Sequence, residues 1–552
     1  MSRRSDDWLR SAKALAQTPW RMAAVLLLAA LFITNIYRAA AQSISHDEAT
    51  IFEWLLSGSW DQVLNMEHGN HHVLSDLFSK LMITIFGTSA FALRIPALLG
   101  GLLYFYSIFR ICAVLFGERI LFLLSVAFLS LNPFVLDYLV AARGYGLAVG
   151  FFCYTLYQII LYWSESPEAR DAKGATQLFH QAGIALGLSV GSNPIMLFPG
   201  GALIASFVGM LFVDGLLQRP ELVTQAAVRD KLRHIKKERA RRTRREAAAE
   251  RRTNPAQRAI LHFVLPAVVV AGFLLLLPKR LIELEPGYMG PPSLFAILEP
   301  LVRFSLLHSP TGFPGLAALF SPSGVIRMIT YGAVPLLLAV LLAVAARIGV
   351  RWTGNRKWNA MPLLDRFLLL LAAMLPTTIV LIVLSRALFA QPYPELRTAM
   401  YWIPLLGLAL LSLLRRVADG SGIERKVYWP MTALVILCVI QFLTQFNTRY
   451  FAEWSYSAAG EDMMRLVRAD HAARPGARVK VGATWQLEPI INFYRIAWGL
   501  DWMDPVYRES PDNVYDYYLL AFGDKRLVEK RHLTELHSDQ LSGTVLAKRT
   551  SF

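Results

Sequence analysis

Charged residues are scarce in this chain. Asp, Glu, Lys and Arg make up only 17% of its 552 residues, whereas a soluble domain usually carries about 25%. Hydrophobic residues make up 55%, and the mean hydropathy is +0.40. This balance excludes an ordinary soluble enzyme and indicates a protein that spans a lipid bilayer several times.

Cysteine is also rare, and nucleotide-binding motifs are missing. The three cysteines, Cys112, Cys153 and Cys438, all fall in apolar segments, and neither a disulfide framework nor metal-ligand spacing links them. The sequence contains no phosphate-binding loop, no GxGxxG motif and no internal repeat. We therefore interpret the cysteines as packing residues and find no sign of a nucleotide site.

The net charge of +16 comes largely from one segment. Residues 229–258 hold thirteen Lys or Arg and four Asp or Glu, a net of +9. A nucleic-acid partner is one explanation of such a run, but the segment lies between two apolar spans. We interpret it as a cytoplasmic loop that obeys the positive-inside rule and contacts anionic membrane lipids, with no nucleic-acid partner.

Apolar runs predict about eleven membrane spans. They lie near residues 21–40, 91–113, 119–136, 144–163, 177–192, 195–216, 259–278, 326–346, 364–385, 399–414 and 427–446. The first could be mistaken for a signal peptide, but it is long enough to be a retained helix. Clusters of Lys and Arg place the N-terminus in the cytoplasm, and counting spans then agrees with the charge bias at each large basic cluster.

The predicted fold class is an all-α polytopic membrane protein with a small C-terminal α/β domain. The membrane domain covers residues 1–446, with an extracytoplasmic loop at 42–90 and the basic cytoplasmic loop at 217–258. Residues 447–552 are more polar and form the second domain, which the span count places outside. Two stretches, VKVGATW and YDYYLLAFG, read as strands, and EDMMRLVRADHAAR reads as a helix.

The first outer loop carries a concentration of titratable residues. His46, Asp47 and Glu48 follow the first span directly, and adjacent carboxylates near a membrane are costly unless they are paired or hydrated. A solvated helix N-terminus is the alternative. Further on, EHGNHHVL contains His68, His71 and His72, which could bind a divalent metal with the carboxylates or could simply hydrogen-bond within the loop.

Two arginines fall at the predicted outer membrane surface. Arg143 lies in AARGYG just before the fourth span, two residues before Tyr145, and Arg397 lies in PELR just before the tenth. Arginine can bind phosphate through two parallel hydrogen bonds. Each could instead extend to the lipid headgroups.

Taken together, these segments resemble the lipid-linked-sugar glycosyltransferases of family 39, the protein O-mannosyltransferase and aminoarabinose-transferase group with the GT-C fold. The matching segments, in order, are HDEA, GNHHVL, FGTSAFALRIPALLGG, NPFVLDYLVAARGYGL and RTAMYWIP. The family usually has His-Pro-Pro where this chain has His71-His72-Val73, so the acceptor class stays open.

The resemblance implies an inverting transfer of a sugar from a polyprenyl-phosphate donor to an extracytoplasmic glycan, lipid or protein acceptor. It implies Asp47 as the base, Glu48 as its support, Arg143 on the donor phosphate and Arg397 as an assistant. His46, His71, His72 and Tyr145 are possible supporting residues, and a metal requirement stays open. The expected location is the cytoplasmic membrane, which is the inner membrane in a cell that has two membranes.

Further expectations concern the base, the acceptor and the competing functions. Partial burial and the neighbouring Glu48 charge would both raise the pKa of Asp47. The C-terminal domain is expected to pack over the outer loops and to help bind the acceptor, with these candidate contacts: Trp485, Glu488, Asn492 and Tyr494. A transporter or lipid flippase is the main alternative function, and a membrane assembly protein without catalysis is a third.

Overall fold

The computed structural model describes residues 18–65, 72–117, 119–164, 172–217, 255–277, 290–307, 322–354, 361–420, 422–473 and 478–550. Within these ranges the chain is a mostly helical, multi-pass membrane protein with a small C-terminal sheet. The basic segment at 229–258 lies mostly outside the described residues, as do His68 and His71.

Nine helical segments in the described ranges are long and apolar enough to cross a membrane. They are α2 (Pro19–Ala41), α6 (Ala90–Phe116), α9 (Tyr145–Ser164), α11 (Leu197–Leu217) preceded by η2 (Pro194–Met196), the run of α13 (Pro255–Ala259), η3 (Ile260–Val264) and α14 (Leu265–Leu276), the run of α16 (Pro322–Met328), η6 (Ile329–Ala333) and α17 (Val334–Gly354), α18 (Leu363–Phe389), α19 (Trp402–Ala418) preceded by η8 (Leu396–Ala399), and α20 (Ile423–Gln445).

The other two predicted spans are helical but less suited to crossing alone. The third is α7 (Ile120–Ser130), a shorter apolar helix, followed by α8 (Pro133–Tyr138). The chain breaks between them because Asn132 caps the second helix and Pro133 cannot continue the first. The fifth is α10 (Ala172–Ser192), which carries Gln177, His180 and Gln181 and is therefore less apolar than the nine.

Glycines allow two central helices to approach closely. Gly146 and Gly150 lie four residues apart on α9 and face Gly100 of α6. A Cβ atom on Gly100 would lie 2.4 Å from the backbone of Gly146, and one on Gly150 would lie 2.4 Å from the Gly100 carbonyl oxygen. Small residues at this spacing let the two backbones touch. The contact fixes the start of α9, directly after Arg143.

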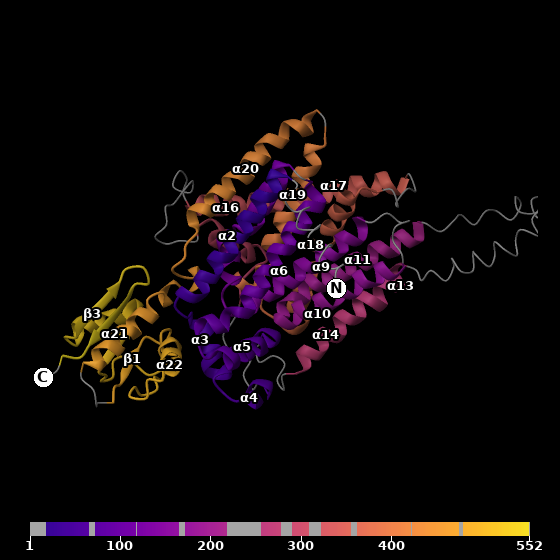
Figure 1. The fold of residues 1–552 in the computed structure, drawn as a ribbon. Helices are drawn as coiled ribbons and strands as arrows, with labels where there is room; N and C mark the ends of the chain where they lie inside the picture. Colours follow the sequence, from indigo (N-terminus) through magenta and orange to yellow (C-terminus); the bar gives the residue numbers. More distant parts are fainter. Residues whose placement is uncertain are drawn as a thin grey trace, which may run out of the picture.

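The segment after α2 folds into short helices at one end of the bundle. These are α3 (His46–Ile51), the π-helical turn η1 (Phe52–Leu56), α4 (Trp60–Asn65) and α5 (Val73–Phe86). Later in the chain, η4 (Phe295–Ile297) and α15 (Leu298–Leu306) precede α16. Figure 1 shows α3, α4 and α5 gathered beside the C-terminal region, with α13 at the opposite end of the bundle.

The C-terminal region contains a four-stranded sheet of order β1-β2-β4-β3. The strands are β1 (Val481–Ala483), β2 (Tyr517–Leu520), β3 (Thr534–Asp539) and β4 (Thr544–Lys548). Strand β1 pairs in parallel with β2, and the other two pairs are antiparallel. The helical elements here are η9 (Ala452–Ser457), α21 (Gly460–Ala472), α22 (Glu488–Ala497), η10 (Phe522–Arg526) and α23 (Leu527–Lys530).

The two strands and the helix predicted for this region are confirmed. The two predicted strands contain β1 and β2, and the predicted helix is α21. Strands β3 and β4 had no prediction. In β3, TELHSD, the side chains are mostly exposed, so it has no run of apolar residues to reveal it.

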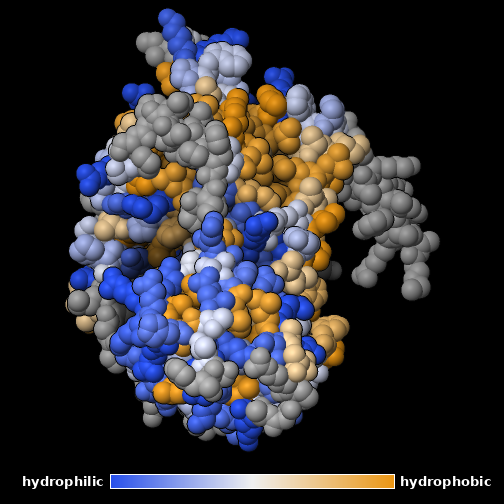
Figure 2. Space-filling model, turned by 90° about the vertical axis from the view of Figure 1, so that its left-hand side faces the viewer, coloured by the Kyte–Doolittle hydropathy of each residue, from blue (hydrophilic) through white to orange (hydrophobic). Residues whose placement is uncertain are grey.

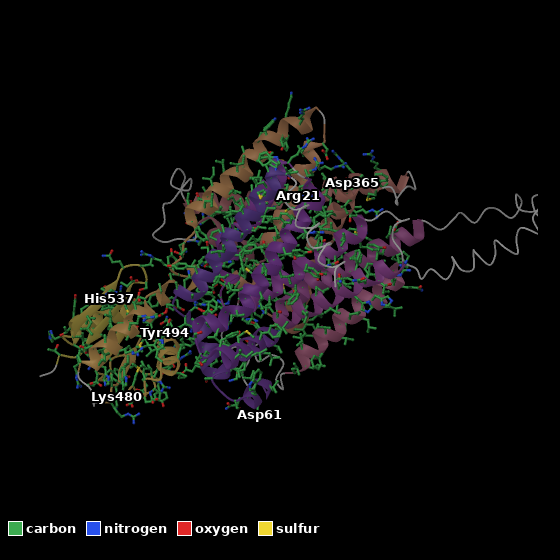
Figure 3. All side chains as sticks on the ribbon, in the orientation of Figure 1. Arg21, Asp61, Asp365, Lys480, Tyr494 and His537 are labelled. Carbon is green, nitrogen blue, oxygen red and sulfur yellow. The ribbon has the colours of Figure 1, made fainter. Side chains whose placement is uncertain are left out.

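The surface differs between the two parts of the molecule. Figure 2 shows an extended hydrophobic area over the helical bundle and a largely hydrophilic surface over the C-terminal region. In Figure 3, Arg21 and Asp365 lie at one end of the bundle, whereas Asp61 and Tyr494 lie toward the other. The predicted inner and outer sets of loops are therefore separated in space.

Candidate functional site

Helix α3 begins in a way that fixes both of its acidic residues. The Ser45 hydroxyl accepts a hydrogen bond from the Glu48 N–H, and the Glu48 carboxylate accepts one from the Ser45 N–H at 2.9 Å. This capping box satisfies backbone groups that a helix start leaves free. Asp47 precedes Glu48 by one residue, so its side chain points in a different direction around the helix.

Glu48 belongs to a buried ion pair with Arg94 of α6. The Arg94 Nε and Nη2 atoms donate to the two carboxylate oxygens at 2.9 and 2.7 Å, and both side chains are fully buried. Arg94 also donates to the carbonyl oxygens of Ala39, Gln42 and Ser43, where the first span ends. The pair therefore holds the loop after α2 against α6.

The same carboxylate also holds the loop that carries Arg143. The Ala142 N–H donates to Glu48 Oε1 at 2.8 Å. Burial would raise the pKa of Glu48, but Arg94 and the backbone donors outweigh it and lower that pKa. Glu48 therefore fixes the start of α3, which carries Asp47, and the loop that carries Arg143.

Asp47 lies between the two arginines singled out in the sequence. Its Oδ2 atom is 2.9 Å from Arg397 Nη2 and 3.5 Å from Arg143 Nη2. The Arg143 Nη1 atom also donates to the Asp47 carbonyl oxygen at 3.5 Å. Residues from three distant parts of the chain thus meet at one point, at the end of the bundle that holds α3.

The expectation of a raised pKa for Asp47 is wrong. Burial does favour a higher value, but the Arg143 and Arg397 guanidinium groups outweigh it and hold the pKa of Asp47 below its ordinary 3.8. The like charge of Glu48 does not contribute as expected, because Arg94 neutralises it. Asp47 is therefore an ionised carboxylate at neutral pH.

Arg397 is held by groups beyond Asp47. Its Nη1 atom contacts the Glu453 carboxylate, and its guanidinium lies 5.6 Å from the centre of the Trp454 ring. The Tyr138 hydroxyl donates to the other oxygen of Glu453. Burial, the largest influence, raises the pKa of Glu453 above its ordinary value.

Leu396, the residue before Arg397, has a φ of 48°. This is a strained left-handed conformation that a non-glycine residue adopts only when its surroundings require it.

Arg143 sits in a tight turn before α9. Gly144 has a φ of 72°, and a Cβ atom there would lie 2.5 Å from the Ser192 carbonyl oxygen, so only glycine fits. Arg143 is 4% exposed, and its Nε atom has no hydrogen-bond partner among the described residues. A buried guanidinium donor of this kind is available to a ligand.

His72 and Tyr145 line the same turn. Their rings pack edge to face with centroids 5.3 Å apart, and both side chains are buried. The His72 N–H donates to the buried Asp76 carboxylate at 3.0 Å. Burial, opposed in part by Arg143, raises the pKa of Asp76 to about 7. These residues shape the wall behind Arg143.

His46 faces the C-terminal region. Its Nδ1 atom lies 2.7 Å from the Gln486 carbonyl oxygen, and its ring lies edge-on to Trp485 at 5.5 Å. Burial lowers the pKa of His46 below its ordinary value. The residue therefore joins the Asp47 helix to the loop between β1 and α22.

The expected packing of the C-terminal region over the outer loop is present. The Ile44 N–H donates to the Tyr494 hydroxyl at 3.0 Å, and Asn492 Nδ2 donates to Glu53 Oε1 at 2.7 Å. Asn492, Tyr494 and Glu488 are buried, whereas Trp485 is exposed. Of the four candidate acceptor contacts, Glu488, Asn492 and Tyr494 are therefore structural, and Trp485 is the one that a ligand can reach.

Several partners in this site were not identified in the sequence. They are Arg38, Arg94, Asp137, Tyr138, Glu453 and Trp454. Arg38 of α2 pairs with Asp137, whose other oxygen accepts from the Ala452 N–H at 2.8 Å. An arginine inside an apolar run must be paired, so the positions of Arg38 and Arg94 in the sequence predict a buried partner for each. Nothing in the sequence named their partners.

The described residues contain no group of three or more His, Cys, Asp or Glu side chains arranged to hold a metal ion. His68 and His71 are outside those residues, so both interpretations of these histidines, metal ligation and hydrogen bonding within the loop, stay untested. The chemistry available at Asp47 is that of a carboxylate flanked by two guanidinium groups.

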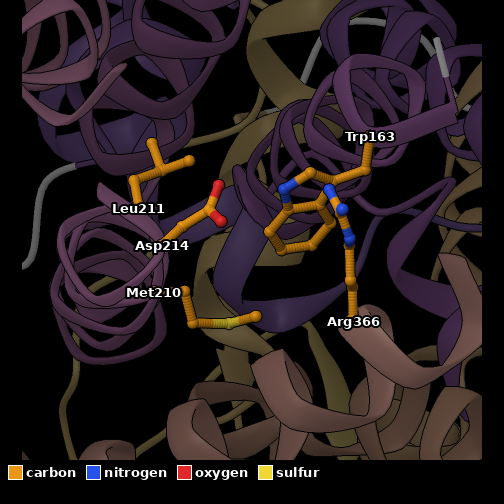
Figure 4. A pocket seen from close by; sticks show the side chains of 5 residues that line it. All are labelled: Trp163, Met210, Leu211, Asp214 and Arg366. Atoms are coloured by element: carbon orange, nitrogen blue, oxygen red, sulfur yellow. The ribbon is translucent and has the colours of Figure 1, made fainter. Parts of the chain in front are cut away.

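Asp47 does not line either of two cavities found among the described residues. One, of about 10 Å³, is lined by Trp163, Met210, Leu211, Asp214 and Arg366, whose side chains surround it in Figure 4. It has room for about one water molecule. A larger apolar groove, of about 330 Å³, lies between α11 and α18 and is lined by Leu197, Phe198, Leu381, Leu384, Ser385, Leu388 and Phe389. No sugar fits the first, and the second offers only apolar contacts apart from one hydroxyl.

Comparison with known proteins finds chains similar to this one among solved structures. No protein-family model and no curated protein sequence matches the chain. The chain is similar to ArnT from Cupriavidus metallidurans bound to undecaprenyl phosphate, at 12% identity and a TM-score of 0.36, covering 97% of this chain and 99% of that one. It is also similar to the apo form of ArnT, at 12% identity and a TM-score of 0.39, covering 95% and 97%. Similarity this low carries no information on activity.

Proposed function

We propose that this chain is a membrane glycosyltransferase that moves a sugar from a polyprenyl-phosphate donor to an extracytoplasmic acceptor, with inversion at the anomeric carbon. The observation that carries the proposal is the meeting of Asp47 with Arg143 and Arg397 at the end of the helical bundle. A carboxylate can take a proton, and two guanidinium groups beside it can bind a phosphate.

The two arginines are the proposed phosphate site. Arg143 supports this role because it is buried and retains an Nε donor without a partner among the described residues. Arg397 is partly exposed and makes its second contact with Glu453, whose pKa burial raises. Its partial exposure leaves the Arg397 guanidinium within reach of an anion.

The reaction needs one base. As the acceptor hydroxyl oxygen bonds to the anomeric carbon, the bond from that carbon to the phosphate oxygen breaks. The hydroxyl proton passes to Asp47, and the electron pair leaves with the polyprenyl phosphate. Because phosphate is a good leaving group, no general acid is required, and the arginines stabilise the charge that develops on it.

The low pKa of Asp47 in the structure fits this scheme as a resting state. A donor phosphate competes with Asp47 for the same two guanidinium groups. When the arginines turn to the phosphate, the carboxylate loses its partners, and its pKa rises toward the value that burial alone would give. The base thus becomes stronger when the donor is bound.

Measuring polyprenyl phosphate released by the purified full-length protein from a panel of labelled polyprenyl-phosphate sugars tests this function. We expect release with at least one donor, and a product of inverted anomeric configuration by NMR. Movement of the intact lipid across a vesicle bilayer without release would instead identify a flippase. Release with retention would exclude the single-base mechanism.

A further inference from the structure

Two half-exposed tryptophans lie where the outer loop meets the C-terminal region. Trp54 belongs to η1 and is 46% exposed, and Trp485 follows β1 and is 52% exposed. Large aromatic side chains that stay exposed beside polar groups commonly mark binding surfaces. These two come from segments more than four hundred residues apart in the chain.

Arg508 fixes the two indoles relative to each other. Its guanidinium carbon lies 5.5 Å from the Trp54 ring centre and 5.6 Å from the Trp485 ring centre, within cation–π range of both. Its Nε atom is anchored to the Glu488 carboxylate at 3.2 Å. The guanidinium covers part of each indole, and about half of each stays open to a ligand.

Hydrogen-bonding groups lie directly beside this surface. Asn492 Nδ2 donates to Glu53 at 2.7 Å and to Glu488 at 3.0 Å, so the two carboxyl groups lie close together. Burial and the Glu488 charge raise the pKa of Glu53 to about 7. The Glu53 carboxyl group can therefore both donate to and accept from hydroxyl groups.

The surface adjoins the proposed catalytic residue. The Trp485 ring lies 5.5 Å from the His46 ring, and His46 is the neighbour of Asp47 in α3. The Gln486 carbonyl oxygen, one residue after Trp485, lies 2.7 Å from His46 Nδ1. A ligand stacked on Trp485 thus lies beside the helix that carries the base.

We propose that Trp54, Trp485, Arg508 and Glu53 form a saccharide-binding site for the acceptor, with the buried Glu488 holding Arg508 in place. This inference rests on the proposed function and names the substrate class of its second subsite. The C–H face of a pyranose ring is apolar and carries partial positive charge, which suits the negative face of an indole. Its hydroxyl groups suit the Glu53 carboxyl group. The acceptor is therefore a glycan or the sugar headgroup of a glycolipid.

Saccharide binding to the purified full-length protein can be measured without any turnover. We use chitotriose and cellotriose as probes and follow the intrinsic tryptophan fluorescence. We expect a saturable change in the wild type and binding about tenfold weaker in Trp485→Ala and in Trp54→Ala, since each loses a stacking surface. The matched control is Trp60→Ala, because Trp60 is also exposed, in α4 of the same loop, and should bind as the wild type does.

A second readout ties the site to the reaction. The same saccharides should increase polyprenyl phosphate release in the wild type and in Trp60→Ala, and this increase should be lost in Trp485→Ala. Saccharide binding with no release from any donor would leave this site intact and refute the proposed function. No fluorescence change in the wild type, equal binding in Trp485→Ala, or quenching of Trp485 by brominated lipids in vesicles would overturn the saccharide site.

Discussion

At the scale of single residues, the two arginines beside Asp47 have different surroundings. Arg143 is buried with one donor unpartnered among the described residues, whereas Arg397 is partly exposed and shared between Asp47 and Glu453. Both arginines lower the pKa of Asp47, Arg143 more than Arg397, and we infer that Arg143, with its open Nε donor, also contributes more to donor binding. The two roles predict different kinetic effects on substitution.

Replacing Arg143 should weaken donor binding. A charge-assisted hydrogen bond contributes about 1.5–3 kcal/mol, so Arg143→Ala should raise the donor Kd by roughly ten- to a hundredfold. Arg143→Lys should restore only part of the affinity, because an ammonium group lacks the planar fork. Equilibrium binding of a labelled donor measures this. Arg386→Ala is the control, since that guanidinium lies 4.4 Å over the Tyr393 ring and away from Asp47.

Replacing Arg397 should change the pH dependence of the reaction. In the wild type, both arginines lower the pKa of Asp47, so its carboxylate stays ionised at pH values below its ordinary pKa. In Arg397→Gln that pKa rises, so the acid limb of kcat/KM should move to higher pH, whereas Arg386→Gln should leave it in place. An unchanged acid limb would show that Arg397 does not act on the base that kcat/KM reports.

The partners of Arg94 and Arg397 could not be predicted from the sequence, and the reason is physical. Arg94 lies in an apolar helix, which predicts that it is paired. Its acceptors, however, come from Glu48 and from three carbonyl oxygens after α2, and their approach depends on how α2 and α6 cross. Glu453 pairs with Arg397 across 56 residues, and no local pattern encodes that contact.

At the scale of elements, the start of α3 is fixed by the buried Glu48–Arg94 pair. This one pair joins the end of α2, the start of α3, helix α6 and the turn before α9. Breaking such a pair leaves a buried charge without its partner, which is far more damaging than losing a surface ion pair.

Arg94→Ala should therefore destabilise the protein by about 3–5 kcal/mol. Glu48→Gln should cost less, because its amide oxygen can still accept from the Ala142 N–H. Thermal unfolding in detergent measures both. Arg465→Ala, which breaks an exposed pair with Glu461, is the matched control and should change little. A melting temperature as high in Arg94→Ala as in Arg465→Ala would contradict this role for Glu48.

Elements with strong hydrophobic signals were predictable, and weakly patterned ones were not. Helices occur at each of the eleven predicted spans because long apolar runs have few other ways to satisfy their backbone groups. Nine meet the length and hydropathy that a span needs. Helices α4 and α5 and strands β3 and β4 had no prediction. Helix α5 is apolar but, at 14 residues, too short to cross a membrane, and the short α4 and the mostly exposed β3 have no long apolar run.

At the scale of the whole molecule, the proposed reaction requires one orientation of the protein in the membrane. The structure places α3 and the C-terminal region at one end and Arg21 and Asp365 at the other. Charge bias predicts that the end with α3 faces the outside. A lipid-linked donor then meets Asp47 at the outer surface.

Reporter fusions test this orientation. A fusion at residue 552 should report an extracytoplasmic location, and a fusion within residues 229–258 should report the cytoplasm. The reason is the strong basic bias of the second segment, with a net charge of +9. A cytoplasmic signal at residue 552 would contradict the outer placement of Asp47.

The central claim is that Asp47 takes the proton from the acceptor, and Asp47→Asn tests it most directly. The amide keeps the shape of the side chain but cannot accept the proton. General-base catalysis contributes about 10²–10⁴-fold, so turnover should fall by that factor while donor binding persists, because Arg143 and Arg397 remain. Asp61→Asn, at an exposed carboxylate of the same loop, should keep full turnover. A folded Asp47→Asn protein that binds donor and turns over at the wild-type rate would contradict the account.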